Sequence, residues 1–428
     1  MKKKLSEDID KNLGPKTKKR DHIKIGRELN FFATSKLIGS GLPFLMPKGA
    51  RVIQLLQRFV EDEEQARGYL LTKTPLLAKR DLFALSGHWP HFKDRMFITA
   101  DEEAMVLKAA TCPFHFSVYN AQLHSYRDLP LRYSEASTLF RKATSSETHG
   151  LVRLRQFTVS EGHIICSEEQ VIDEFKEALN LATYFMQTLG FGKDVLYTLS
   201  KWNESNKGKY VGETYLWERV QNLLYDTVSD LNLDFTVLEG KAPFYGPKFD
   251  VNLKSAYEKQ ERIITIQLDF SLAKMFGMTY VDMNNKKKHP IILHRTSVGS
   301  YERMLAMLLE KYDGAMPTWL SPTQVKVLTT SEKYNDYAKT IVEKLRNQKV
   351  RVEEDFRREK LSYKIKNAQF ERVPYALIIG EKEQQNATVA VRSRSKGEEG
   401  SKNTDDVIAR ILLDIHTKSL EAVMNSEI

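Results

Sequence analysis

Half-polar β-type runs dominate the chain between residues 70 and 300, and they restrict the kind of sheet that it can form. Many of these runs are too polar on alternate residues to be buried on both faces, which favours an antiparallel sheet with one face lined by functional side chains. The runs are LLTKTPLL (70–77), MFITA (96–100), LPLRYSEAS (129–137), LVRLRQFTVSEGHIIC (151–166), FDVNLKSAY (249–257), RIITIQLDFSL (262–272) and PIILHRTSVG (290–299). We therefore predict an α+β fold rather than a doubly wound one.

Segments with helical periodicity lie between these runs, and the arrangement of strands and helices changes in the last quarter of the chain. Apolar residues recur at i, i+3 and i+4 in residues 167–190 and 213–232, and a further helix is expected in residues 52–69. From about Pro322, short strands alternate with helices, which predicts a small α/β domain with a mostly parallel sheet. The predicted divisions are a flexible, Lys-rich arm over 1–20, a first domain over 21–318 and a second over 319–428.

Composition limits the classes of protein to consider. The 428 residues are 41% hydrophobic, enough to bury a full core, and no apolar run approaches the roughly 20 residues that span a bilayer. The N-terminus lacks a hydrophobic signal region and there are two cysteines, so we expect a soluble cytoplasmic protein in a reducing compartment, with no membrane contact. A net charge of +9 is compatible with a nucleic-acid partner or with a merely basic surface.

Five residues carry candidate chemistry. Cys112, His163 and His294 could hold a metal ion with three protein ligands and an open fourth position. Arg141 and Arg303 could bind phosphate through their guanidinium groups. Spacing alone leaves other interpretations open, because a lone cysteine is often a small buried hydrophobe, a lone histidine a core residue and an arginine a structural one.

A series of motifs, in order along the chain, resembles the threonyl-tRNA synthetase family of class II aminoacyl-tRNA synthetases. The resemblance covers roughly residues 20 to 415. The motifs are DHIKIGRELNFF (21–32), SGHW (86–89), CPFH (112–115), SYRDLPLRYSEA (125–136), FR (140–141), HGLVRLRQFT (149–158), FYGPKFD (244–250), IQLDFSL (266–272), HRTSVGSYER (294–303), PTQV (322–325) and EKLSYKIKNAQ (359–369). Each is a weak signal by itself, but their order across two domains is specific.

The resemblance implies an activity, a fold and partners. The family joins L-threonine to tRNA(Thr) through a threonyl-adenylate made from ATP and Mg²⁺, with one Zn²⁺ per subunit reading the amino and hydroxyl groups of threonine. The first domain would then be a class II antiparallel-sheet catalytic domain and the second an anticodon-binding domain. A homodimer is expected, built around the helix at 51–67 and the strand that ends at Pro75.

The resemblance also assigns roles to individual residues. The implied catalytic residues are Arg141 (α-phosphate and substrate carboxylate), Arg303 (γ-phosphate) and His88 (proton transfer from the terminal ribose); the substrate- and ATP-binding residues are Glu161, Tyr245, Lys248 and Gln267; the zinc ligands are Cys112, His163 and His294; and the anticodon-reading residues are Glu383 and Arg392. Arg357, Arg358, Lys360, Lys364 and Lys366 form a basic strip suited to phosphates, or a solvated face. A packing role remains open for His88, and a structural turn or strand for the substrate-binding set.

Departures from the family pattern keep a second hypothesis open. Ala143 stands where a glutamate usually reads adenine, Val159 replaces a glutamine, Glu161 replaces an aspartate, and Gly162 replaces an alanine in a way that could let the backbone shift around the longer carboxylate. The alternative is a divergent paralogue that keeps the fold as a regulatory or RNA-binding module, or that charges a different acceptor.

Serine differs from threonine by one methyl group and tests whether the chain edits its product. Zinc would accept the serine hydroxyl as well as that of threonine, and only about 20 polar residues precede the catalytic region, where the usual bacterial enzyme has an editing domain. We therefore expect no editing in cis and measurable seryl-tRNA formation by the purified chain unless a separate factor removes it. Charging with radiolabelled serine tests this, and undetectable serylation at high serine would contradict it.

Overall fold

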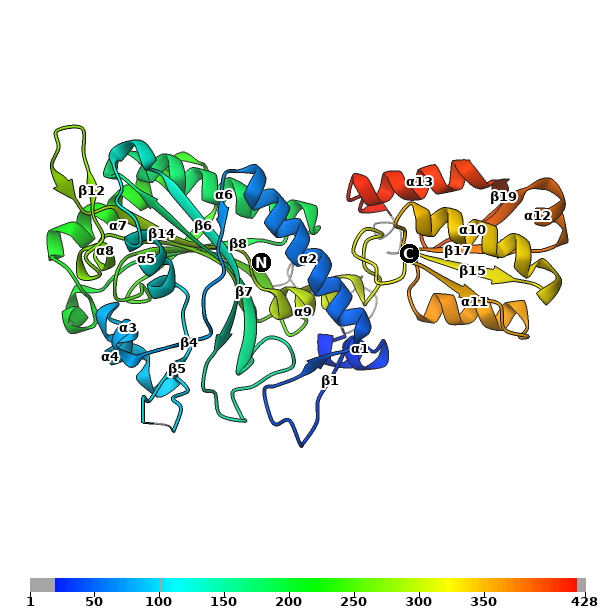
Figure 1. Cartoon of the computed structure of the whole chain (residues 1–428), viewed down its shortest axis with the longest axis horizontal. Helices are drawn as coiled ribbons and strands as arrows, with labels where there is room; N and C mark the ends of the chain where they lie inside the picture. The colour runs from blue at the N-terminus through cyan, green and yellow to red at the C-terminus, as the bar shows by residue number, and fades with distance from the viewer. Residues whose placement is uncertain (1–19, 101, 422–428) are drawn as a thin grey trace, which may run out of the picture.

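The computed structural model describes residues 20–100 and 102–421, so the expected N-terminal arm lies outside the described residues apart from Arg20. Figure 1 shows two bodies along the long axis, one built on an eight-stranded sheet and one on a five-stranded sheet. No helix within the two described ranges is both long and apolar enough to cross a membrane.

The eight-stranded sheet is largely antiparallel, which confirms the predicted fold class. Its neighbouring strands are antiparallel except for the outer pairs β3·β6 and β8·β9, which are parallel. In spatial order the strands are β3 (Leu70–Leu71), β6 (Leu131–Phe140), β7 (Gln156–Cys166), β14 (Ile291–Ser300), β11 (Gln260–Asp269), β10 (Lys248–Lys254), β8 (Leu196–Ser200) and β9 (Phe235–Leu238).

The two faces of this sheet have different environments because successive strand residues point to opposite sides. On β7, Ile164 and Cys166 belong to the large core under the helices α2 (Pro47–Ala66), α6 (Val171–Thr188) and α9 (Tyr301–Tyr312). Ile165 points the other way, into a smaller core with Cys112 and Tyr245, beside α5 (Cys112–Asn120). Glu161 and His163 alternate with the core residues of β7 in the same way and lie on this second face.

The five-stranded sheet is only half parallel, so the expectation of a mostly parallel sheet is wrong for its second half. β16 (Val352–Asp355), β15 (Val325–Thr329) and β17 (Tyr375–Ile379) are parallel, whereas β18 (Thr388–Ser393) and β19 (Gly397–Asn403) follow as antiparallel neighbours. The sequence pattern missed β19 because GEEGSKN has almost no residues with high strand propensity. Pairing with β18 overrides that propensity at this sheet edge.

Helices cover both faces of the smaller sheet. α10 (Asn335–Asn347) and α13 (Thr404–His416) pack on one side, and α11 (Leu361–Phe370) packs on the other (Figure 1). The remaining helices and strands are α1 (His22–Glu28), β1 (Phe32–Ala33), β2 (Phe44–Leu45), β4 (Leu77–Ala78), α3 (Arg80–Leu85), α4 (His88–Phe92), β5 (Val106–Leu107), α7 (Thr214–Asp230), α8 (Leu272–Met275), β12 (Tyr280–Val281), β13 (Lys287–Lys288) and α12 (Glu381–Asn386). Short 3₁₀ helices lie at Lys93–Arg95, Tyr126–Asp128, Glu168–Gln170, Glu204–Lys209 and Glu332–Tyr334.

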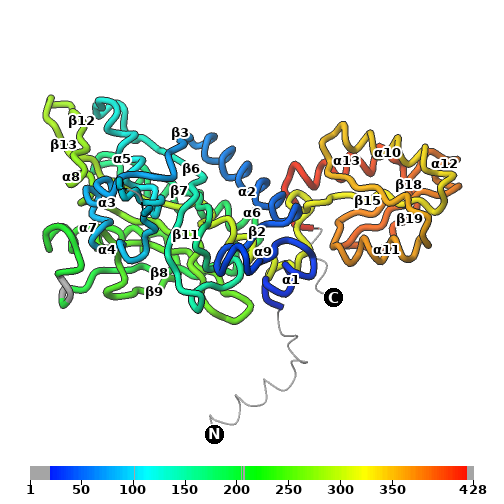
Figure 2. Tube along the Cα trace, turned by 60° about the horizontal axis from the view of Figure 1, so that its bottom comes forward, coloured from blue at the N-terminus to red at the C-terminus, as the bar shows by residue number. Residues whose placement is uncertain are grey.

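Arginines of the smaller body hold the connecting segment 316–321. Arg351 donates from Nη2 to Trp319 O at 2.7 Å and from Nε to Ser321 O at 2.9 Å, and Arg394 donates from Nη2 to Met316 O at 2.7 Å. Trp319 also packs edge to face on Phe59 of α2, with ring centroids 5.1 Å apart. Figures 1 and 2 both show α2 on the side of the larger body that meets the smaller one.

A buried ion pair fastens α2 to the core face of the large sheet. Arg295 on β14 is 2% exposed, and its Nη1 donates to Oε1 of Glu64 at 2.6 Å. The Ser297 hydroxyl donates to the same oxygen at 2.6 Å, and the guanidinium lies 4.0 Å from the ring centroid of Tyr69. The pair therefore compensates a charge that would otherwise be costly to bury.

We expect Glu64→Ala to lower the free energy of unfolding by about 3–5 kcal/mol, because it leaves the Arg295 charge buried and unpaired. The neighbouring Glu63→Ala removes a partly exposed i,i+4 pair with Arg67 and a hydrogen bond from the Tyr184 hydroxyl, and should cost about 1–2 kcal/mol. Urea denaturation of both variants measures the difference. Equal losses would contradict a special role for the buried pair.

Candidate active site

Cys112, His163 and His294 come together on the second face of the large sheet. Cys112 begins α5, with Pro113 in its first turn, while His163 and His294 are directly opposite each other on the paired strands β7 and β14. All three side chains are buried, and their ligand atoms lie within 4.8 Å of one another. The structure thus brings together three residues that are 51 and 131 positions apart in successive steps of the chain.

The orientation of His294 is fixed by an acidic partner, Asp269, which is not among the residues that the sequence assigned to the site. Asp269 Oδ2 lies 2.9 Å from His294 Nε2, and its Oδ1 accepts hydrogen bonds from the backbone N–H groups of Ser271 and Leu272, both at 2.9 Å. Because a carboxylate only accepts, His294 carries a hydrogen on Nε2, and its Nδ1 faces His163 Nε2, 3.1 Å away. The sequence signal that could have identified Asp269 is the motif IQLDFSL (266–272), in which it lies.

The electrostatics of the trio favour a cation. Burial opposes protonation of His294, but the neighbouring Cys112 sulfur and the Asp269 carboxylate raise its pKa to about 10. Burial and the adjacent His294 and His115 rings instead hold the pKa of His163 well below its usual range. The trio therefore stabilises one positive charge, at His294, and disfavours a second one at His163.

Glu161 and Arg141 flank the trio. Glu161 is two residues before His163 on β7, so both project from the same face of the sheet. Burial raises the pKa of Glu161, whereas the Arg141 guanidinium and His294 act to lower it. Arg141 follows β6, donates from Nε to Ala109 O at 3.1 Å and lies 5.4 Å from the ring centroid of Phe157. These contacts hold Arg141 through Nε and through its guanidinium group beside the Phe157 ring.

Tyr245 and Gln267 form one wall of the same site. The Tyr245 ring stacks on His294, with centroids 4.8 Å apart and planes at 25°, and its hydroxyl donates to the side-chain oxygen of Gln267. Burial raises the pKa of Tyr245, so the phenol keeps its proton. Gln267 is also the strand partner of Lys248 on β10.

His88 lies near this wall as a neutral imidazole. Its ring packs edge to face on Phe244, with centroids 5.8 Å apart, and burial lowers its pKa to about 3. Nδ1 is 3.1 Å from the carbonyl oxygen of Ser86 and 3.0 Å from the Ser86 hydroxyl. Since the carbonyl can only accept, the hydrogen belongs on Nδ1 and the lone pair on Nε2.

Two predicted ligand-binding residues have protein partners instead. Arg303, at the start of α9, donates to Val152 O from Nε at 3.2 Å and from Nη2 at 3.0 Å, and to Arg262 O from Nη1 at 2.7 Å. The Lys248 ammonium is buried and donates to Asp250. Any phosphate role for these two residues requires that they exchange or share these contacts.

The predicted anticodon residues are on the smaller body, away from the trio. Glu383 of α12 is 9% exposed and accepts from Gly380 N at 3.1 Å and from Ser401 Oγ at 2.6 Å. Arg392 of β18 lies 3.9 Å from Glu398. These two side chains therefore have different partners within the described residues.

The basic strip is smaller than the sequence suggests. Lys364 is buried and donates to Thr329 O at 2.8 Å, so its inclusion in the strip is wrong, and Arg357 is paired with Asp355. The α11 helix turns Lys364 inward, whereas Lys360 and Lys366 remain exposed together with Arg358. Three exposed cations of the strip, Arg358, Lys360 and Lys366, therefore remain beside the Arg357–Asp355 ion pair.

Gly162 has a structural reason that the sequence did not show. It is opposite Arg295 on β14, on the core face of the sheet, whereas Glu161 points to the other face. A Cβ atom at position 162 would lie 2.5 Å from Cζ and Nε of Arg295. Glycine here makes room for the buried guanidinium, which is a different reason from the suggested backbone adjustment around Glu161.

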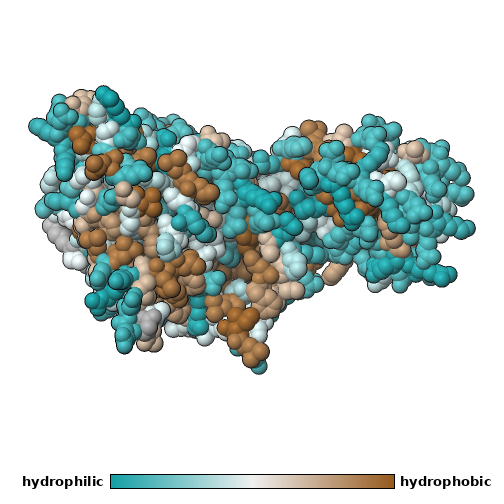
Figure 3. All heavy atoms as spheres, viewed as in Figure 1, coloured by the Kyte–Doolittle hydropathy of each residue, from teal (hydrophilic) through white to brown (hydrophobic). Residues whose placement is uncertain are grey.

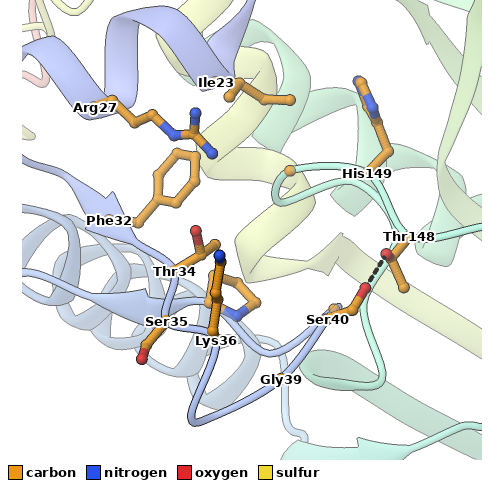
Figure 4. Close-up of a pocket in the computed structure, with 13 residues that line it drawn as sticks. Ile23, Arg27, Phe32, Thr34, Ser35, Lys36, Gly39, Ser40, Thr148 and His149 are labelled. Atoms are coloured by element: carbon orange, nitrogen blue, oxygen red, sulfur yellow. Dashed lines mark hydrogen bonds between the residues drawn. The ribbon is translucent and has the colours of Figure 1, made fainter. Parts of the chain in front are cut away.

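A separate surface groove of about 420 Å³ lies between α1, the loop joining β1 to β2, and residues 148–150. Figure 4 shows Arg27, Lys36 and His149 at its walls and the Ser40–Thr148 hydroxyl contact, 2.9 Å long, at one end. The loop joining β1 to β2 ends in an apolar tip that Figure 3 shows in brown, where Leu37 is 98% exposed. None of the predicted site residues lines this groove. The candidate active site is therefore the region around the trio.

Family models match both bodies of the chain. Residues 96–312 match the tRNA synthetase class II core domain (G, H, P, S and T), and residues 324–412 match the anticodon binding domain. The antiparallel sheet, its buried polar face and these matches define a class II aminoacyl-tRNA synthetase core.

Individual relatives narrow the family. The threonine–tRNA ligase of Clostridium perfringens is 54% identical over 402 residues, covering 93% of this chain and 62% of the relative, and that of Geobacillus kaustophilus is 39% identical over 417 residues, covering 96% and 64%. The chain thus spans less than two thirds of the length of these curated relatives.

Two solved structures extend this similarity. The RNA binding domain of threonyl-tRNA synthetase from Cryptosporidium parvum Iowa II has a TM-score of 0.87 at 33% identity, covering 92% of this chain and 98% of that one. A putative threonyl-tRNA synthetase from Aeropyrum pernix has a TM-score of 0.81 at 25% identity, covering 94% and 96%. The chain belongs to the threonyl-tRNA synthetase family of class II aminoacyl-tRNA synthetases.

We expect Gly162→Ala to lower the free energy of unfolding by about 1–3 kcal/mol, because the added methyl group must displace the buried Arg295 guanidinium. Gly208→Ala is a suitable control, since a Cβ atom there meets nothing within 4 Å. Urea denaturation measures both. A neutral Gly162→Ala would show that the guanidinium can move without cost.

Proposed function

We propose that this chain attaches L-threonine to tRNA(Thr) through a threonyl-adenylate, with residues 21–318 as the catalytic domain and 319–428 as the anticodon-binding domain. The observation that carries the proposal is the buried Cys112, His163 and His294 trio next to Glu161 and Arg141. The class II core alone does not choose the amino acid. A trio with one sulfur and two imidazoles provides a reason for selecting a substrate that can coordinate a metal.

The residues of the trio fit zinc by the chemistry of their donors. Two nitrogens on one tetrahedral Zn²⁺, at bonds of about 2.0–2.1 Å, are about 3.3 Å apart, close to the 3.1 Å between His163 Nε2 and His294 Nδ1. Cys112 supplies the third donor, and Asp269 orients His294 from behind. When bound, one zinc per subunit would coordinate the threonine amino and hydroxyl groups at its open side, which valine cannot match.

The side chains around the trio would orient the first reaction. Glu161 can accept hydrogen bonds from the threonine amino group, and the terminal nitrogens of Arg141 can bind the threonine carboxylate and the ATP α-phosphate together. This alignment favours in-line attack of the carboxylate on the α-phosphorus, with Mg²⁺ bound to ATP. Tyr245, Gln267 and Lys248 would close the pocket, and Arg303 would bind the γ-phosphate after releasing a carbonyl contact.

His88 would act in the second reaction, the transfer to tRNA. It is neutral at physiological pH because its pKa is about 3, and its Nε2 lone pair is available because Nδ1 binds the Ser86 carbonyl. A neutral imidazole can take the proton of the ribose hydroxyl that attacks the adenylate once the negative phosphate of the bound adenylate raises its low pKa. The Phe244 ring beside it would keep water away from this proton transfer.

The smaller body would bind the anticodon arm of tRNA. Glu383 and Arg392 would read bases, and the exposed Arg358, Lys360 and Lys366 would contact phosphates. A cytoplasmic homodimer is the assembly that we propose for this activity.

Threonine-dependent ATP–pyrophosphate exchange tests the proposal. We expect exchange in the unmodified chain and a loss of at least about 100-fold in Cys112→Ala, because a ligand of the proposed zinc is removed. The control is Cys166→Ala, since Cys166 is the other buried free cysteine and lies on the core face of β7. Its exchange rate should stay close to that of the unmodified chain.

The same assay distinguishes the proposed threonine-attaching activity from the divergent-paralogue hypothesis. A chain that binds zinc and folds normally but shows no threonine-dependent exchange would refute the proposed activity. Exchange that depends on another amino acid would instead indicate a different substrate.

A further inference from the structure

A buried polar network extends behind His163, away from the proposed substrate. It joins Thr72, Thr74, Lys108, His115 and Glu135, which come from the segment after β3, the segment before α5, α5 itself and β6. Lys108 and His115 have no solvent exposure, and Glu135 is 3% exposed. Buried polar groups are costly without partners, so each donor in this network must point at an acceptor. The direction of each hydrogen bond can therefore be assigned.

Glu135 sets that direction at one end. Its Oε1 accepts from Lys108 Nζ at 2.7 Å, and its Oε2 accepts from the Thr74 hydroxyl at 2.8 Å. Lys108 Nζ also donates to Thr74 Oγ1 at 2.6 Å, so the Thr74 hydrogen is directed at the carboxylate. Paired with an ammonium group in this way, the Glu135 carboxylate acts only as an acceptor.

Two acceptors consequently face Nε2 of His115. Glu135 Oε2 lies 3.4 Å away, and Thr72 Oγ1 lies 2.9 Å away while the Thr72 hydroxyl donates to Ser134 O at 3.0 Å. The hydrogen of the neutral His115 ring therefore belongs on Nε2, and its Nδ1 carries a lone pair.

His115 then determines which nitrogen of His163 is free. Their Nδ1 atoms are 2.8 Å apart, so His163 must donate its Nδ1 hydrogen to the His115 lone pair. This leaves a lone pair on His163 Nε2, which faces the other two residues of the trio and lies 3.1 Å from His294 Nδ1. The opposite tautomer would place a hydrogen where a metal ligand needs a lone pair.

We infer that His115 is a positioning residue that holds His163 in its metal-binding tautomer, with Thr72 and Glu135 fixing His115 in turn. This inference rests on the proposed function, because it concerns the same zinc site. His115 itself does not reach the substrate side of the trio. Its contribution is to preorganise one of the three ligands, as Asp269 does for His294 from the other side.

Zinc affinity tests the inference without relying on activity. We expect His115→Phe to weaken zinc binding by about 10- to 100-fold in a chelator competition, since the acceptor for His163 is lost. Thr72→Val should weaken it less, because Glu135 remains as an acceptor, and Thr72→Ser should match the unmodified chain. His124→Phe is a control for replacing a partly buried histidine, since His124 stacks on Tyr119 and binds its carbonyl without touching the trio. Circular dichroism establishes that each variant is folded.

A spectroscopic measurement on the zinc-free chain adds an independent readout. Nitrogen-15 shifts of the His163 ring should show the hydrogen on Nδ1 in the unmodified chain and a mixture of tautomers in His115→Phe. A structural role for His115 alone would not change this ratio.

The outcomes separate this inference from the proposed function. Normal zinc affinity in a folded His115→Phe variant, or hydrogen on Nε2 of His163 in the unmodified zinc-free chain, overturns the positioning role while leaving the zinc site intact. Failure of the unmodified chain to bind zinc overturns the proposed zinc site and this inference together.

Discussion

The register between β7 and β14 is the constraint on which the candidate site depends. It sets His163 directly opposite His294 and, one position away on the other face, Gly162 opposite Arg295. A slip of one residue would turn every one of these side chains to the wrong side of the sheet. The same pairing therefore produces both the proposed metal site and the buried charge that anchors α2.

The two faces are complementary in their electrostatics. On the core face, the Arg295 guanidinium is compensated by Glu64 of α2, and glycine at position 162 provides the space for it. On the other face, two histidines and a cysteine collect around a position that favours positive charge, with Asp269 behind one histidine and His115 behind the other. The carboxylates of Glu64 and Asp269 and the ring of His115 thus supply partners for charged or polar groups that would be costly to bury alone.

Strongly periodic segments were predictable because one local pattern determined them. The half-polar runs indicated the antiparallel sheet, and the i, i+3, i+4 runs indicated α6 and α7 within a few residues. β19 was missed because its residues have little strand propensity and its pairing with β18 is a tertiary effect. Lys364 was misjudged because composition does not reveal which side of α11 faces the sheet.

The sequence by itself determined the family, the fold class and the types of donor available at Cys112, His163 and His294, since motif order and side-chain chemistry are carried by residue identity. Only the tertiary structure decided that these donors converge, that Asp269 and His115 stand behind the two histidines, and that Gly162 accommodates Arg295. Those relations join residues far apart in the chain through strand register and buried hydrogen bonds. Their directions depend on which atoms face each other, and local sequence patterns do not contain that information.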